Sequence, residues 1–187
     1  MARLLGISGS LRKGSYNTAL LRAARERLAA GSTIELATLQ GIPLYDGDVE
    51  VASGVPDAVQ TLKEQVIASD GVLIATPEYN NGIPGVLKNA IDWLSRPPDD
   101  IGRVFHGRSF ALLGASPGGF GTILAQNAWL PVLRTLRADF WGEGRLMVSR
   151  AGKVFDGTGQ LQDEAVGEQL TKFVAGFADH CDARKTR

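Results

Sequence analysis

The sequence predicts an α/β fold in which a parallel β-sheet lies between two layers of helices. Short apolar runs alternate along the 187 residues with longer segments whose apolar residues recur at helical spacing. One of these runs, Gly71–Thr76, is apolar nearly throughout, which is typical of a strand buried on both faces. Because the chain contains no internal repeat and no linker-like stretch, we expect residues 1–187 to form one domain.

Five strands separated by helices follow from the order of these segments. We expect strands at Arg3–Ser8, Thr33–Thr38, Gly71–Thr76, Ser109–Ala115 and Gly144–Ser149, and helices at Asn17–Ala30, Pro56–Ala68, Gly85–Ser95, Thr122–Arg137 and Asp163–His180. Pro56 suits the first turn of the Pro56–Ala68 helix, and Pro97-Pro98 closes the Gly85–Ser95 helix. Five strands in this order suit the flavodoxin-like three-layer sandwich, a five-stranded parallel sheet of order 2-1-3-4-5 with helices on both faces.

In such a sheet, ligands bind beyond the carboxyl ends of the strands, at the crevice between strands 1 and 3 where the strand order reverses. The loops after strands 1, 3 and 4 are therefore expected to have unusual compositions. They are the segments Gly9–Thr18, Pro77–Gly85 and Ser116–Gly121, which are rich in glycine, proline, asparagine and hydroxyl residues.

Composition and charge limit the classes of function. The chain has 20 basic and 20 acidic residues, so its neutral charge argues against a nucleic-acid or membrane partner. One cysteine and two histidines exclude an intrachain disulfide and make a Cys/His metal site implausible. His180 and Cys181 lie in what looks like a polar C-terminal tail and are not expected to form a nucleophile pair. No apolar run approaches the about 18 residues of a membrane span, and none resembles a signal peptide, so a cytoplasmic location is expected.

The Gly9–Thr18 loop has the features of a phosphate cradle. Its glycines allow a tight turn, its hydroxyl and N–H groups can face an anion, and the helix that follows presents a positive N-terminus. Gly9 and Gly14 match the Walker A spacing, but Ser15-Tyr16 stands where a nucleoside triphosphate site needs lysine and a hydroxyl residue. The dinucleotide fingerprint also fails, which leaves a terminal monophosphate as the predicted ligand group. The alternative is an ordinary turn of small residues.

The other two loops suit a flat ring system. Tyr79 can lie against a planar ring, Asn80 can satisfy ring heteroatoms, and the glycine-dense segment after strand 4 can bring N–H groups close to a negatively charged ring. Taken alone, the loop after strand 3 could be a common turn before a helix, and the loop after strand 4 could be a flexible glycine loop. Together with the phosphate cradle they predict FMN.

The motifs resemble those of the NADPH-dependent FMN reductases, a flavodoxin-like family that includes quinone, chromate and azo-dye reductases. The resemblance rests on Gly9-Ser10-Leu11-Arg12-x-Gly14-Ser15-x-Asn17, Pro77-Glu78-Tyr79-Asn80, Ile83-Pro84-Gly85-Val86-Leu87-Lys88-Asn89-Ala90-Ile91-Asp92-Trp93 and Ser116-Pro117-Gly118-Gly119. It implies that the FMN phosphate is held by Ser10, Arg12, Ser15, Asn17 and Thr18. It further implies that Pro77, Glu78, Tyr79 and Asn80 line the isoalloxazine and ribityl chain, and that Ser116 and Gly119 flank the pyrimidine side.

The same resemblance implies a reaction and an assembly. NAD(P)H, with NADPH favoured, would give hydride to bound FMN, and a quinone, flavin or similar small-molecule acceptor would then take the electrons in a ping-pong sequence. No catalytic side chain is assigned, because the flavin carries the chemistry. A homodimer or homotetramer is expected through the third and fourth helices, with Trp93 and Trp129 between subunits.

The sequence leaves two points open, the electron acceptor and the class of function. Thr122-Ile123-Leu124-Ala125 is apolar where some quinone- and chromate-reducing members are richer in arginine, which puts the acceptor and any tetramer contact in doubt. A flavodoxin-type electron carrier or a non-catalytic FMN-binding protein could use the same loops. Carriers that dock by charge are usually acidic, and this chain is neutral.

Overall fold

Three buried strands form the centre of the computed structural model, which describes residues 1–185. They are β1 (Arg3–Ser8), β3 (Gly71–Ala75) and β4 (Ser109–Ala115). Apart from Arg3, every residue of these strands is buried, as expected for strands with helices on both sides.

The sheet has the predicted order, β2-β1-β3-β4-β5, and all its strands are parallel. β2 (Thr33–Ala37) forms one edge. Two short strands share the other edge, because β4 pairs first with β5 (Asp139–Phe140) and then with β6 (Leu146–Val148). The predicted fifth strand corresponds to β6, and β5 was not predicted.

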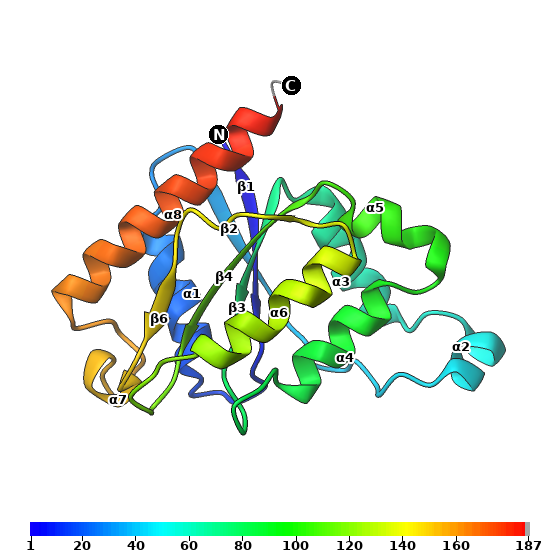
Figure 1. Ribbon diagram of the computed structural model, residues 1–187, viewed down its shortest axis with the longest axis horizontal. Helices are drawn as coiled ribbons and strands as arrows, with labels where there is room; N and C mark the ends of the chain where they lie inside the picture. The colour runs from blue at the N-terminus through cyan, green and yellow to red at the C-terminus, as the bar shows by residue number, and fades with distance from the viewer. Residues whose placement is uncertain (186–187) are drawn as a thin grey trace.

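The helices form the two outer layers of a three-layer sandwich (Figure 1). They are α1 (Tyr16–Arg27), α2 (Gly47–Ser53), α3 (Asp57–Ala68), α4 (Gly85–Leu94), α5 (Ile101–Phe105), α6 (Ile123–Thr135), α7 (Ala151–Val154) and α8 (Glu164–Lys185), with a 3-10 turn at Pro98–Asp100. One apolar cluster joins α1, α7 and α8 to one face of the sheet, and a second joins α3, α4, α5 and α6 to the other. α2 has no buried residue and lies outside the two layers, beyond α4 (Figure 1).

The C-terminal segment is not the polar tail expected from the sequence. α8 continues to Lys185, and Cys181 is buried against β3, where a Cβ on Gly71 would lie 2.5 Å from its Sγ. The Met1 ammonium pairs with Asp182 at 2.6 Å, so the two ends of the chain lie side by side (Figure 1). The expectation failed because the apolar stripe of α8 continues among charged residues that are paired at its surface.

Both tryptophans expected between subunits belong to the interior of this chain. Trp93 and Trp129 are 0% exposed without any partner present. The Trp93 indole N–H donates to the Pro43 carbonyl at 2.9 Å, and that of Trp129 donates to Thr76 Oγ1 at 3.2 Å. The expected burial between subunits is therefore wrong, because α4 and α6 turn these rings inward.

A buried lysine holds the segment after α4 in place. Lys63 on α3 is 0% exposed, and its Nζ donates to the Arg96 carbonyl at 2.5 Å and to Asp100 Oδ2 at 2.7 Å. The hydrogen bond from this ammonium holds the pKa of the Asp100 carboxyl below its ordinary value. The pair connects α3 to the turn that precedes α5.

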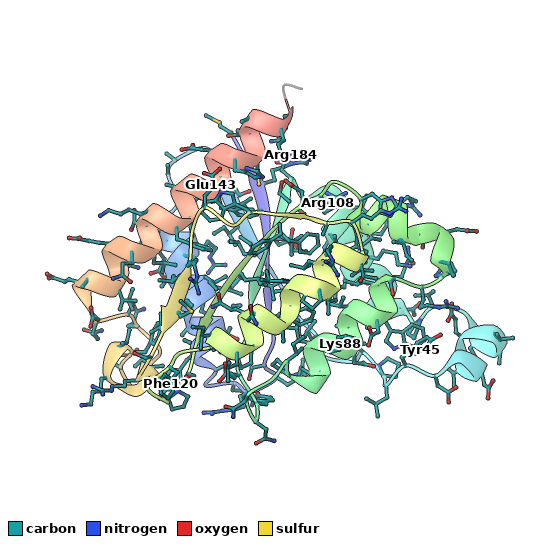
Figure 2. The ribbon with its side chains drawn as sticks, viewed as in Figure 1. Tyr45, Lys88, Arg108, Phe120, Glu143 and Arg184 are labelled. Carbon is teal, nitrogen blue, oxygen red and sulfur yellow. The ribbon has the colours of Figure 1, made fainter. Side chains whose placement is uncertain are left out.

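We predict that Lys63→Met lowers the free energy of unfolding by about 2–3 kcal/mol, because Asp100 and the Arg96 carbonyl lose a buried partner. Lys88→Met is the control, since Lys88 pairs with Asp92 on the surface of α4 (Figure 2) and such pairs contribute less than about 0.5 kcal/mol. Denaturant titration measures both. Equal losses of unfolding free energy in the two variants would contradict the stabilising role given to the buried Lys63 ammonium.

Acid should reduce the difference between wild type and Lys63→Met. A carboxyl whose pKa is lowered on folding stabilises the protein above its unfolded-state pKa, about 4 for aspartate, and this contribution is lost as pH falls through the lower folded-state pKa. Repeating the titrations from pH 7 towards pH 3 tests this sign.

Candidate active site

Polar side chains appear at the carboxyl ends of all three central strands. Ser8 ends β1, Thr76 follows β3 and Ser116 follows β4, and all three are buried. This edge includes the point between β1 and β3 where the strand order reverses. Figure 2 shows Phe120, from the loop after β4, at this end of the molecule, with Arg108 and Arg184 at the opposite end. The three unusual loops therefore meet at one edge, as predicted.

The loop after β1 leads directly into α1. Ser15 is the N-cap of α1, and its Oγ accepts a hydrogen bond from the Thr18 N–H at 3.3 Å. Thr18 Oγ1 donates to Ser8 Oγ at 2.8 Å. The Arg12 guanidinium is exposed and makes one long contact, to the Gly14 carbonyl at 3.5 Å. The loop thus combines a helix N-terminus, hydroxyls and an accessible cation, which suits a phosphate group.

Asn17 has a structural partner that the sequence did not reveal. Its side chain is 3% exposed, its Nδ2 donates to the Ala115 carbonyl at 2.9 Å, and its Oδ1 accepts from the Ala115 N–H at 2.9 Å. One N–H of Nδ2 is left for any further acceptor. Asn17 therefore joins the start of α1 to the end of β4.

The loop after β3 contains a tight turn. Tyr79 and Gly82 exchange backbone hydrogen bonds of 3.1 and 3.0 Å, and Asn80 and Asn81 between them have φ of 50° and 61°. Positive φ at both central positions defines a type I′ turn, which asparagine accepts better than most residues. Tyr79 is 45% exposed, and its hydroxyl lies 3.5 Å from Ser10 Oγ in the first loop.

Pro77 and Glu78 connect the second loop to its neighbours. A Cβ on Gly9 would lie 2.7 Å from Pro77 Cδ, so the first two loops are in direct contact. Glu78 Oε2 accepts hydrogen bonds from the N–H groups of Leu124 and Ala125 at 2.9 and 3.0 Å. These amides lie in the first turn of α6, where a carboxylate is favourable and where Thr122 provides no side-chain cap. The carboxylate thus makes structural hydrogen bonds.

The loop after β4 has open space in front of two of its glycines. A Cβ on Gly119 would meet nothing within 4 Å, and one on Gly118 would meet only Ser116 Oγ at 3.7 Å. The packing of this chain therefore does not require glycine there, whereas a ligand close to the backbone would. The loop is held from behind, because the Ser116 N–H donates to Val148 and its carbonyl accepts from Ala151.

Two residues near this edge were missed by the sequence analysis. Ser8 supplies the hydroxyl that fixes Thr18, and the signal was a polar residue at the end of an apolar strand. Phe120 is 85% exposed between glycines, an unusual position for an aromatic side chain.

The described residues offer neither a cluster of metal ligands nor a reactive thiol. Within residues 1–185, no three His, Cys, Asp or Glu side chains are grouped so that they could hold a metal ion. Burial raises the pKa of the Cys181 thiol to about 12, so it stays protonated at neutral pH. No helix in the same range combines the length and apolar character that crossing a membrane requires.

A doubly wound parallel sheet with three unusual loops at its carboxyl edge is the arrangement in which flavin nucleotides bind. The sequence profile of the NADPH-dependent FMN reductase family matches residues 2–153. The chain belongs to this family, whose members are oxidoreductases that use FMN.

Named relatives agree with this assignment. An NAD(P)H-dependent FMN reductase of Pseudomonas aeruginosa is 48% identical over 168 residues, 90% of this chain and 89% of the relative. A quinone reductase of Escherichia coli is 36% identical over 179 residues, 95% and 94% of the two chains. The flavoenzyme FerB of Paracoccus denitrificans, an NAD(P)H:acceptor oxidoreductase, superposes with a TM-score of 0.86 at 30% identity and 98% coverage of both chains.

We predict that Glu78→Ala lowers the free energy of unfolding by about 1 kcal/mol, because two N–H groups of α6 lose their acceptor. It should also weaken FMN binding several-fold, since the second loop loses its connection to α6. Glu143→Ala, which removes an exposed carboxylate (Figure 2), should change stability by less than about 0.5 kcal/mol. Denaturant unfolding and fluorescence titration with FMN measure both effects. If Glu78→Ala bound FMN as tightly as the control variant, the link between the Glu78 hydrogen bonds and FMN binding would be refuted.

Proposed function

We propose that this chain passes hydride from NAD(P)H through bound FMN to a quinone, flavin or similar small-molecule acceptor, in a ping-pong reaction. The observation that carries the proposal is the meeting of three tethered loops at the switch point of the sheet, with open space before Gly119. The activities for which the relatives are named, quinone reductase and NAD(P)H:acceptor oxidoreductase, support it.

In this proposal the first loop holds the FMN phosphate. Ser10, Ser15 and Thr18 contribute hydroxyl and N–H groups at the start of α1, and Arg12 contributes a charge-assisted hydrogen bond. Asn17 takes part chiefly by holding α1 against Ala115, with one amide N–H left for the phosphate.

The other two loops form the walls of the ring site. Pro77, Glu78, Tyr79 and Asn80 line the isoalloxazine and ribityl chain, with the Tyr79 ring exposed for contact and the Glu78 carboxylate fixing the wall to α6. Ser116 and Gly119 flank the pyrimidine side. When bound, FMN supplies the acceptance and release of hydride, so the protein needs only to orient it and leave one face accessible.

We also propose that residues 1–187 act as one FMN-binding domain in a cytoplasmic homodimer or homotetramer that uses α4 and α6. Since Trp93 and Trp129 are buried within the chain, the α6 contribution would come from the exposed side chains of Ile123, Leu124 and Leu130. The unpaired Cys181 suits a reducing compartment.

Anaerobic mixing with NADPH tests the reaction. The FMN-loaded protein should lose its flavin absorbance at about 450 nm on mixing, because the cofactor accepts hydride, and regain it when a quinone is added without oxygen. An electron carrier without an NAD(P)H site would stay oxidised in the first step. Intersecting rather than parallel double-reciprocal plots in steady state would contradict the ping-pong order.

Arg12→Ala tests the phosphate anchor. Loss of a charge-assisted hydrogen bond worth about 1.5–3 kcal/mol should weaken FMN binding about 10- to 100-fold. Arg25→Ala, an exposed cation farther along α1, should leave the dissociation constant unchanged. Fluorescence titration gives both values, and unchanged affinity in Arg12→Ala would mean that its charge is not on the phosphate.

A further inference from the structure

A second crevice lies on the side of the first loop that faces away from β3. It has a volume of about 230 Å³ and is bounded by the first loop, the first turns of α1 and the end of β2. None of its lining residues comes from the loops after β3 or β4, so the proposed ring site does not use this space. Ser10, Arg12 and Thr18, which the proposed function assigns to the FMN phosphate, also line the crevice, so it adjoins the proposed phosphate site.

The crevice has an apolar floor and a polar rim. Leu21, Leu36 and Leu39 form the floor. On the rim, Gln40 Nε2 donates to the Leu11 carbonyl at 3.3 Å, and the Gln40 N–H donates to Thr38 Oγ1 at 3.1 Å. The first of these bonds holds the segment after β2 against the first loop, and the second is local to that segment. The crevice is thus suited to a ligand with both an apolar surface and a polar group.

The charge of the rim is entirely positive. Arg12, Lys13 and Arg22 line the crevice, and none of its lining residues is acidic. Within residues 1–185, none of these three cations forms an ion pair, although the chain as a whole has equal numbers of acidic and basic residues. Neighbouring like charges repel, so a bound anion would be stabilised by all three.

We propose that this crevice binds the 2′-phosphate of NADPH, with part of its adenosine against the leucine floor. The inference rests on the proposed function, and it explains how one nucleotide would be chosen over the other. A phosphate monoester dianion can pair with Arg22 and Lys13, whereas the 2′-hydroxyl of NADH leaves these charges without a partner. Ser10, Arg12 and Thr18 line the crevice and are also assigned to the FMN phosphate, so the two phosphates would lie on adjoining parts of the first loop.

Two molecules in this proposal carry a phosphate monoester, NADPH and FMN, so the two must be told apart. The first turn of α1 serves the FMN phosphate in the proposed function, through Ser15, which does not line the crevice, and Thr18, which does. Arg22 lies a full turn beyond Thr18, on the β2 side of α1. Removing the Arg22 charge should therefore affect the pyridine nucleotide and spare FMN.

The direct test is calorimetric titration of the FMN-loaded protein with adenosine 2′,5′-bisphosphate and with adenosine 5′-monophosphate. The wild type should bind the first at least 10-fold more tightly, because only the first carries the 2′-phosphate. Arg22→Gln should reduce that preference several-fold, and Arg25→Gln should retain it. Equal binding of the two probes by the wild type would overturn the proposal.

Kinetics provide a second arm. In Arg22→Gln the KM for NADPH should rise about 10- to 100-fold while the KM for NADH changes less than about twofold. Lys13→Gln, on the loop instead of the helix, should shift the same preference in the same direction. Equal increases for both nucleotides in these variants would contradict a 2′-phosphate site.

FMN titration of Arg22→Gln distinguishes the two phosphate sources. Unchanged FMN affinity supports a separate subsite, and a loss as large as that of Arg12→Ala would assign the crevice to the FMN phosphate instead. Failure of the broader function is recognisable separately, since neither NADPH nor NADH would then reduce the flavin of the wild type.

Discussion

Burial of β1, β3 and β4 on both faces is the constraint on which the rest of this structure depends. Strands enclosed by two apolar clusters have almost no room for polar side chains along their length. Hydroxyl side chains therefore appear where the strands end, at Ser8, Thr76 and Ser116. Because all three strands are parallel, these ends lie at one edge, and the edge becomes the site.

The loops at that edge are bound to one another as well as to their own strands. Asn17 joins α1 to Ala115, Glu78 joins the second loop to α6, and the Tyr79 hydroxyl lies close to Ser10. Each connection links segments that are far apart in the sequence. The positions of the loops relative to one another are thus fixed by a few polar contacts between elements, which rigid strands alone do not provide.

The sequence predicted what depends on local pattern and failed where long-range contacts decide. Continuous apolar runs identified β1, β3 and β4, and the motifs placed all three loops correctly at the switch point. The two-residue strand β5 and the four-residue helix α7 are too short to give a periodic signal. α2 has no buried residue and hence no apolar face to detect.

Side-chain partners were the harder part of the site. Nothing near Asn17 in the sequence shows that its amide faces Ala115, 98 positions away. Nor does the composition of α6 show that its N-terminal amides are capped by a residue from another loop. The inward direction of Trp93 and Trp129 also depends on packing against the sheet, which a list of helical positions does not contain.

The division of the outer sheet edge between β5 and β6 has a consequence for how copies of this chain can meet. Between Phe140 and Leu146 the chain leaves the sheet, so the edge beside β4 offers no long row of unpaired N–H and C=O groups. Such rows allow sheets of different molecules to join strand to strand, and proteins commonly interrupt them. On this side, self-association by sheet extension is disfavoured. Aggregation through this edge is hindered by the same break.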